Sequence, residues 1–270
     1  MSEQRVALVT GISSGIGLAT ASRLLTVGFR TFGTIRQASR AGRLAQGLEL
    51  IRLDVRDEKS VAVGIEEVLE KAGRIDALVN NAGTALVGSL EETRIDEARE
   101  LFDTNFFGVL RTTKAVLPIM RRQNHGRIVN ISSVLGFLPA PYLGVYAASK
   151  HALEGYSESL DHEVRRFGIR VSVIEPGFTR TKFNQNSQLI SQPLAVYSAE
   201  RELAQAAVAK SIANGDQPDA VASVVIKAIT SRNPRLRYSG GSEARLLSIL
   251  KKFAPERILD RGLRKQFGLP

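Results

Sequence analysis

Two residues four positions apart, Tyr146 and Lys150, have side chains that could carry acid–base chemistry. On a helix, residues at this spacing lie on the same face, so the phenol and the ammonium group would project together. A phenol has a pKa of about 10 and is a poor base at neutral pH. A cation beside it favours the phenolate and lowers that pKa, which would make Tyr146 a usable general acid or base. Ser133, thirteen residues before Tyr146, offers a hydroxyl that could hold a substrate oxygen. Because such a Tyr–Lys pair also occurs on solvated helix faces, the surrounding elements must decide its meaning.

A glycine-rich turn follows the first apolar run of the chain, residues 5–10. The glycines are spaced as Gly11, Gly15 and Gly17, and a helical pattern follows them up to Gly28. A strand, a glycine turn and a helix in this order form the context of a dinucleotide-binding fingerprint. The glycines let the backbone approach the pyrophosphate, whose negative charge is favoured at the helix N-terminus. We therefore expect a dinucleotide cofactor at this turn.

The end of the second expected strand, residues 30–35, bears on which dinucleotide is bound. NAD-selective proteins usually carry an acid here for the ribose 2′-hydroxyl, whereas this chain has Ile35 followed by Arg36. An arginine can pair with a 2′-phosphate through charge-assisted hydrogen bonds. The pattern therefore favours NADP over NAD. The alternative is that Arg36 is a surface arginine on a loop.

Short apolar runs alternate with helical patterns through most of the chain, which predicts an α/β fold with a parallel sheet. We expect a single Rossmann-type, doubly wound domain over residues 1–270, with about seven parallel strands and helices on both faces. Besides the two strands above, strands are expected at residues 49–53, 76–79, 127–131, 169–174 and 236–238. Ligands bind at the carboxyl ends of such strands, and Ser133 follows one of them directly.

Two helical stretches carry features beyond a simple amphipathic pattern. Residues 95–120 are interrupted at Asn105–Gly108, where Asn and Gly are both weak in helix interiors. Bulges inside helices often mark sites, although a tolerated polar residue is the alternative. The helix that carries Tyr146 and Lys150 has an apolar stripe and a second stripe of small residues. Two buried faces favour packing against another subunit, so we expect a homodimer or homotetramer.

Two regions toward the C-terminus are expected to shape the substrate site. Residues 183–198 are polar and poorly periodic, and we interpret residues 183–215 as a substrate loop region. Residues 242–270 form a basic extension with two apolar helical faces, which must bury against something. The favoured partner is the protein's own surface, where the extension would roof the pocket or form a subunit contact. The alternative is an anionic membrane surface.

Composition excludes several classes of function. The 270 residues include no cysteine, which excludes disulfides and thiolate metal sites, and the three histidines show no metal-ligand spacing, so no metal is expected. The chain lacks an apolar run long enough for a membrane span and a signal-peptide pattern at its N-terminus, so a cytoplasmic protein is expected. The net charge is +10, concentrated in residues 232–270. No nucleic-acid reader motif accompanies this charge, and no nucleic-acid partner is expected.

Together these features resemble the short-chain dehydrogenase/reductase family in its compact single-domain form, over about residues 6–181. The resemblance rests on Thr10–Gly17, Asn80–Gly83 and Pro176–Thr181, in the order and spacing of that family. The family's catalytic tetrad falls on Asn105, Ser133, Tyr146 and Lys150. The resemblance implies that the cofactor is bound by Gly11, Ser13, Ser14, Gly15, Ile16, Gly17, Arg36, Asp54, Val55, Asn81, Ala82, Gly83, Tyr146, Lys150, Pro176, Gly177, Thr179 and Thr181.

The same resemblance implies a hydride transfer between a nicotinamide and a carbonyl or alcohol carbon of a hydrophobic small molecule. Tyr146 would protonate the forming alkoxide, or deprotonate the alcohol in reverse. Lys150 would lower the tyrosine pKa and hold the nicotinamide ribose. Ser133 would orient the carbonyl oxygen, and Asn105 would position a water that relays the proton.

The ends of the cofactor are assigned in the same way, with Asp54 beside the adenine amino group and Thr181 beside the carboxamide. Residues 33–36, with the basic tail, are similar to 17β-hydroxysteroid and retinol dehydrogenase-like members that use NADP. Two other functions stay open at this point. One is a ketoacyl-carrier-protein reductase, because a basic tail could serve an acidic carrier. The other is a non-catalytic dinucleotide sensor, since the fold does not fix the function.

Overall fold

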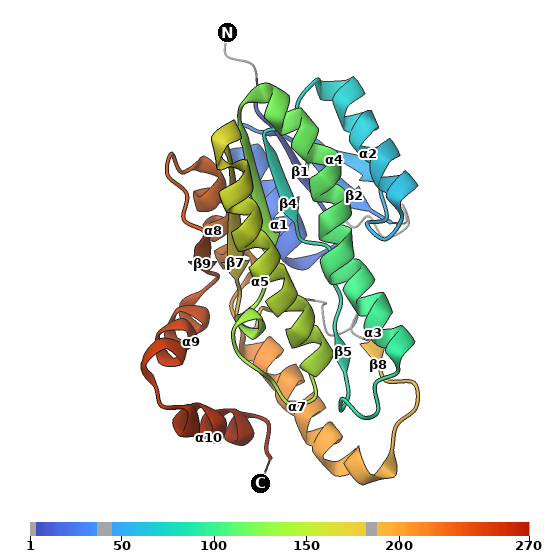
Figure 1. Cartoon of the computed structure of the whole chain (residues 1–270), viewed down its shortest axis with the longest axis vertical. Helices are drawn as coiled ribbons and strands as arrows, with labels where there is room; N and C mark the ends of the chain where they lie inside the picture. The colour runs from blue at the N-terminus through green and yellow to red at the C-terminus, as the bar shows by residue number, and fades with distance from the viewer. Residues whose placement is uncertain (1–3, 37–44, 182–187, 270) are drawn as a thin grey trace.

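A seven-stranded parallel sheet forms the centre of the computed structural model, which describes residues 4–36, 45–181 and 188–269 (Figure 1). The strand order is β3-β2-β1-β4-β6-β7-β9. These strands are β1 (Val6–Val9), β2 (Arg30–Ile35), β3 (Leu48–Arg52), β4 (Ala77–Asn80), β6 (Gly126–Ile131), β7 (Ile169–Glu175) and β9 (Arg237–Ser239). A separate two-stranded sheet joins β5 (Leu86–Val87) to β8 (Gln188–Leu189). The predicted parallel α/β fold is confirmed.

Helices cover both faces of the large sheet because its strands carry apolar residues on both sides. On β1 the adjacent residues Leu8 and Val9 point to opposite faces. Leu8 packs with the helices α2, α4 and α5, whereas Val9 packs with α1 and α8. These helices span α1 (Gly15–Thr26), α2 (Glu58–Ala72), α4 (Gly108–Gln123), α5 (Gly144–Val164) and α8 (Pro218–Thr230). The sheet is therefore doubly wound, as predicted.

The order of the strands determines where a ligand can bind. The chain winds from β1 outward to β3, then crosses back and continues from β4 outward to β9 on the other side. Strands β1 and β4 are neighbours and register Val9 with Val79. A crevice opens at such a reversal, beyond the carboxyl ends of the strands. The glycine turn after β1 and the segment after β4 both lead into this crevice.

The helix predicted around residues 95–120 is interrupted where the sequence indicated. It begins as α3 (Ile95–Phe102), widens into a π-helical turn at Asp103–Phe107, and continues as α4. Asn105 lies inside the π-helical turn and is buried. A π-helical turn of this kind re-aims the side chains at one level of a helix, and here it directs Asn105 toward the segment after β4.

The C-terminal third consists mainly of helices. Part of the predicted loop region 183–215 lies outside the described residues (182–187), and its second half is the helix α7 (Ser198–Asn214). The chain ends in α9 (Ser242–Phe253) and α10 (Glu256–Gln266), which run along the outer edge of the molecule (Figure 1). Among the described residues, no helix combines the length and the apolar character that crossing a membrane requires.

Candidate active site

A cavity of about 350 Å³ lies at the carboxyl ends of β1, β4 and β6. Its wall includes seventeen of the eighteen cofactor positions proposed from the sequence and three of the four catalytic positions. The two predicted residues that are not on its wall are Gly17 and Asn105, both of them buried just behind it. The remaining predicted positions on the wall are Gly11, Ser13, Ser14, Gly15, Ile16, Arg36, Asp54, Val55, Asn81, Ala82, Gly83, Ser133, Tyr146, Lys150, Pro176, Gly177, Thr179 and Thr181.

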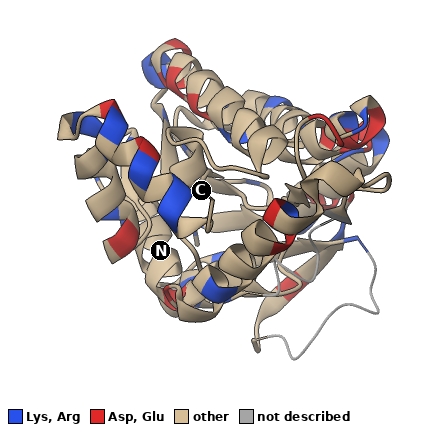
Figure 2. Ribbon diagram, turned by 90° about the horizontal axis from the view of Figure 1, so that it is seen from below, with Lys and Arg blue, Asp and Glu red and all other residues tan. Residues whose placement is uncertain are grey.

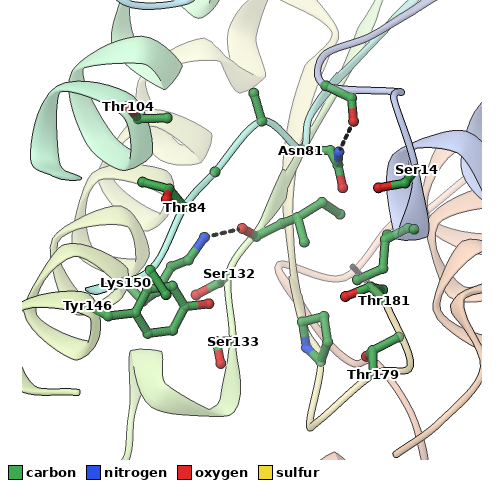
Figure 3. A pocket seen from close by; sticks show the side chains of 18 of the residues that line it. Ser14, Asn81, Thr84, Thr104, Ser132, Ser133, Tyr146, Lys150, Thr179 and Thr181 are labelled. Atoms are coloured by element: carbon green, nitrogen blue, oxygen red, sulfur yellow. Dashed lines mark hydrogen bonds between the residues drawn. The ribbon is translucent and has the colours of Figure 1, made fainter. Parts of the chain in front are cut away.

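Tyr146, Lys150 and Ser133 lie together at one end of this cavity (Figure 3). Ser133 directly follows β6, and Tyr146 and Lys150 occupy successive turns at the start of α5. The Nζ atom of Lys150 donates a hydrogen bond of 2.8 Å to the carbonyl oxygen of Ile131 on β6. The same nitrogen lies 5.6 Å from the centre of the Tyr146 ring. The sheet and the helix therefore hold the two titratable groups in a fixed relation.

Burial dominates the protonation of both groups. It raises the pKa of Tyr146 to about 12, and a hydrogen bond with Ser133 acts in the opposite direction. It also lowers the pKa of Lys150 to about 8, against the attraction of the Glu154 carboxylate. The direction for Tyr146 differs from the expectation that Lys150 lowers its pKa, because removing the phenol from water disfavours the phenolate. At neutral pH Tyr146 is therefore a proton donor.

The Asn105 amide bridges three elements rather than facing the cavity. Its Oδ1 accepts a hydrogen bond of 2.9 Å from the backbone N–H of Thr84, and its Nδ2 donates one of 2.9 Å to the carbonyl oxygen of the same residue. A further bond of 3.2 Å runs from Nδ2 to Ser149 Oγ on α5. The side chain thus fixes the segment after β4 against the helix that carries Tyr146 and Lys150.

The glycine turn fits closely against the segment after β4. Asn81 Nδ2 donates hydrogen bonds of 3.0 Å and 2.9 Å to the carbonyl oxygens of Thr10 and Gly11. A Cβ on Gly17 would lie 2.4 Å from Asn81 Nδ2 and 2.5 Å from the Gly11 carbonyl oxygen. Gly11 itself has a φ of +70°, and a Cβ there would lie 2.8 Å from the Ala82 Cα. Glycine is required at both positions.

The start of α1 points its backbone N–H groups at the cavity. Ser14 precedes the helix in an extended conformation, and its side chain makes no capping hydrogen bond. With Ser13, Gly15 and Ile16 it lines the cavity wall. An anionic group is favoured at such a helix N-terminus. The glycines of the turn and the helix start fit the pyrophosphate of a dinucleotide.

Two arginines stand at the other end of the cavity, beside Asp54. Arg36 follows β2 as predicted, whereas Arg56 was not identified from the sequence. Arg56 donates hydrogen bonds of 2.8 Å and 3.2 Å to the two carboxylate oxygens of Asp54. These bonds hold the pKa of Asp54 below its usual range, and the charge of Arg36 acts in the same direction. The two guanidinium groups line this end of the cavity together with the carboxylates of Asp54 and Glu100.

The opposite part of the cavity is apolar and comes from segments that are far apart in the sequence. Its wall is formed by Val87, Leu135, Leu143, Phe178, Val208 and Ile212. Phe267, at the end of α10, is 3% exposed and packs against this same group of residues. Sequence reasoning did not identify these wall residues, since no local spacing connects them. Phe267 lies behind this wall, and the expectation that the extension roofs the pocket stays a prediction.

A buried group of charges lies behind Lys150. Glu154, one turn further along α5, accepts a hydrogen bond of 3.1 Å from Nε of Arg237 on β9. The same nitrogen lies 3.7 Å from Oε1 of the buried Glu175 at the end of β7. Burial raises the pKa of Glu154, and burial with the nearby Glu154 charge raises that of Glu175 to about 7. The sequence signal for this group of charges was the position of Glu154, four residues after Lys150, and the sequence analysis did not identify it.

No group of metal-ligating side chains occurs in the described residues.

Sequence comparisons place these features among known proteins. Residues 5–190 match the sequence profile of the family described as short chain dehydrogenase. The chain is 36% identical to the 3-ketodihydrosphingosine reductase of Bacteroides thetaiotaomicron over 97% of either protein. It is 37% identical to retinol dehydrogenase 8 of Bos taurus, over 93% of this chain and 86% of that protein.

Structural comparisons agree with these sequence matches. A short-chain dehydrogenase from Streptomyces avermitilis has a TM-score of 0.81 and 34% identity, covering 97% of this chain and 99% of that one. A Burkholderia phymatum short-chain dehydrogenase/reductase in complex with NAD has a TM-score of 0.81 and 25% identity, covering 96% and 95%. A metagenomic short-chain oxidoreductase in complex with NADP has a TM-score of 0.70 and 27% identity, covering 88% and 96%.

Proposed function

The chain belongs to the short-chain dehydrogenase family, and from this premise we propose that it is an NADP-dependent oxidoreductase for hydrophobic carbonyl compounds and their alcohols. The family membership makes it an oxidoreductase that uses a nicotinamide dinucleotide with a small-molecule substrate. The observation that carries the finer proposal is a single cavity with two arginines at one end, a proton donor and an apolar wall. These three parts match a phosphorylated cofactor, a carbonyl group and a hydrophobic substrate.

The residues at the centre of the cavity have distinct tasks in this proposal. A bound nicotinamide cofactor supplies the hydride to the carbonyl carbon, or accepts it in reverse. Tyr146, whose pKa burial raises to about 12, is protonated at neutral pH and donates the proton to the carbonyl oxygen. Ser133, which hydrogen-bonds Tyr146, orients that oxygen beside the phenol. Lys150 places a cation next to the phenol, and this cation stabilises the phenolate that remains after the transfer.

The apolar wall supports a hydrophobic substrate. Val87, Leu143 and Val208 are buried side chains that line the cavity near Tyr146, and burying apolar surface of a ligand against them is favourable. Two of the similar proteins, a 3-ketodihydrosphingosine reductase and a retinol dehydrogenase, have names that denote lipophilic substrates. We infer a ketone, aldehyde or alcohol with a large apolar part.

The two arginines at one end of the cavity support NADP over NAD. Arg36 and Arg56 both line the cavity beside Asp54, so a 2′-phosphate would meet two guanidinium groups. Asp54 is engaged by Arg56, and Ile35 stands where an NAD-selective protein usually has an acid. Similar structures hold either dinucleotide, so the preference rests on these arginines.

Replacing Tyr146 with Phe tests the reaction. The Tyr146→Phe variant keeps the ring but loses the proton donor, so kcat should fall by about 10² to 10⁴-fold while NADPH binding persists. Tyr156→Phe is a matched control, because Tyr156 lies on the same helix but not on the cavity wall. Steady-state kinetics and NADPH fluorescence measure the two effects. A Tyr146→Phe enzyme with near wild-type kcat would exclude this role.

Replacing Arg36 with Ala tests the cofactor preference. Loss of a charge-assisted contact costs about 1.5–3 kcal/mol, which corresponds to roughly ten- to a hundredfold in NADPH affinity. NADH affinity should remain almost unchanged. Arg52→Ala is the control, because Arg52 is an exposed arginine at the end of β3 that does not line the cavity. Equal losses for both cofactors would return Arg36 to a structural role.

A further inference from the structure

Helix α9 presents large apolar side chains to solvent. Leu246, Ile249, Leu250 and Phe253 recur at spacings of three and four residues, so they lie on one face of the helix. Their exposed fractions are 57%, 50%, 38% and 74%, and Ile258 at the start of α10 is 60% exposed. We call these five residues the apolar ridge. Leaving such side chains in water forgoes a favourable free energy of burial for each of them.

The apolar ridge is held in place but is not covered by the rest of the chain. At its start, Ala244 is buried, and Glu243 accepts a hydrogen bond of 3.2 Å from the backbone N–H of Phe178. At its far end, Phe267 is buried against the cavity wall. Between these anchors, no described residue of α10 is buried. The ridge is therefore an ordered surface that faces outward.

Unpaired cations flank the apolar ridge. Arg245 and Lys252 lie on one side of it on α9, and Arg261 and Lys265 lie three and seven residues after Ile258, on the same face of α10. None of these four forms an ion pair within the described part of the chain, and all are exposed. Blue segments recur along the helix that leads to the C-terminus (Figure 2). Residues 242–270 carry seven Lys and Arg against three Asp and Glu.

We propose that the apolar ridge and its flanking cations dock the protein on the surface of an anionic lipid bilayer. An amphipathic helix with basic residues beside its apolar face lies in the bilayer interface, where burial of apolar side chains and attraction to anionic lipid add together. A second copy of the chain fits this surface less well. A two-fold contact pairs a patch with itself, so it would bring the unpaired cations of both copies together.

Sedimentation of the full-length protein with lipid vesicles tests the docking without reference to turnover. The wild type should bind vesicles of phosphatidylcholine mixed with phosphatidylglycerol and bind weakly to phosphatidylcholine alone. Binding should weaken as salt rises, because salt screens the cations. Leu246→Ser with Phe253→Ser should lower the partition coefficient on the order of a hundredfold. Arg245→Gln with Lys252→Gln should lower it on the order of tenfold.

Matched controls use the same kinds of substitution elsewhere on the surface. Val63→Ser with Ile95→Ser removes two apolar side chains that are 63% and 69% exposed. Lys59→Gln with Lys114→Gln removes two exposed lysines from other helices. Both control proteins should bind anionic vesicles as the wild type does.

Three results would overturn the proposal. The first is a wild-type protein that does not sediment with anionic vesicles, and the second is an equal loss of binding in the control variants. The third extends the first: the wild type does not bind vesicles, and analytical ultracentrifugation shows that the Leu246→Ser, Phe253→Ser protein has a different oligomeric state. That result would assign the ridge to a second copy of the chain.

Discussion

The glycine turn and the C-terminal extension differ in how closely the surrounding structure confines them. At Gly17, a single added carbon would meet a backbone oxygen at 2.5 Å, whereas Gly262 on α10 has nothing within 4 Å of that position. At Gly11 and Gly17 the surrounding backbone leaves no room for a side chain. The extension is anchored to the body by the buried Ala244 and Phe267, and packing against the body does not confine its middle in the same way. The cofactor end of the molecule is thus specified by steric fit, and the substrate end by burial of a few apolar side chains.

The strongest test of this difference is an added methyl group at the turn. Gly17→Ala should lower NADPH affinity by more than about a hundredfold, because the Gly11 carbonyl and the Asn81 amide must both move to admit it. Isothermal titration measures this loss. Gly155→Ala is the control, because a Cβ on that helical glycine meets nothing within 4 Å and should stabilise the helix by about 0.5–1 kcal/mol. An unchanged NADPH affinity in Gly17→Ala would remove the steric basis of the comparison.

A second test concerns the apolar wall at the substrate end. Phe267→Ala should raise KM for bulky apolar substrates by about tenfold, because the truncation removes buried packing behind Val87 and Val208. The NADPH affinity should not change, and small carbonyl substrates should be affected less. Phe253→Ala removes the same side chain from a position that is 74% exposed and should leave the kinetics unaltered. Equal KM values for wild type and Phe267→Ala would separate the extension from the substrate cavity.

The smallest expected effect is a shift in the pH dependence of kcat/KM when the Glu154 charge behind Lys150 is removed. If the Lys150 ammonium is required, kcat/KM for reduction falls as pH rises through its pKa of about 8. The Glu154 carboxylate raises that pKa, so Glu154→Gln should move the fall to lower pH while the rate at acid pH persists. The other groups near Lys150 are the same in the wild type and in Glu154→Gln: Tyr146 and Ile131 face Lys150, and Arg237 and Glu175 adjoin position 154.

Glu158→Gln is the control for that experiment. Glu158 binds the same Arg237, at 2.9 Å, but its side chain is 49% exposed, against 8% for that of Glu154. The Glu158→Gln profile should therefore coincide with that of the wild type. Coincident profiles for both variants would show that Glu154 has a packing role alone.

Local sequence patterns predicted the features that depend on residues close together in the chain. The alternation of apolar runs and helical stretches predicted the seven parallel strands, and Asn105–Gly108 marked the π-helical turn. The four-residue spacing placed Tyr146 and Lys150 on one helix face, and the structure brings both to the cavity with Ser133. Each of these inferences rests on hydrogen-bonding geometry within a few residues, which the sequence contains directly.

Other features depend on contacts between distant residues and could not be predicted in this way. Arg237 on β9 reaches Glu154 on α5 across 83 residues, and Phe267 packs behind a wall whose members lie more than a hundred residues apart. The effect of burial on the Tyr146 pKa could not be predicted either, because spacing places the lysine but does not report how much water the fold removes.

The sequence by itself determined the order of strands and helices, the glycine turn and the types of the reacting groups. These follow from backbone stereochemistry and from residue spacing along a single element. Only the tertiary structure decided which charges are buried together, as with Glu154, Arg237 and Glu175. It also decided which apolar faces are covered, since it buries Phe267 and leaves Phe253 exposed. The physical reason is that burial depends on how elements pack against one another. The sequence of one element does not specify which other elements will cover it.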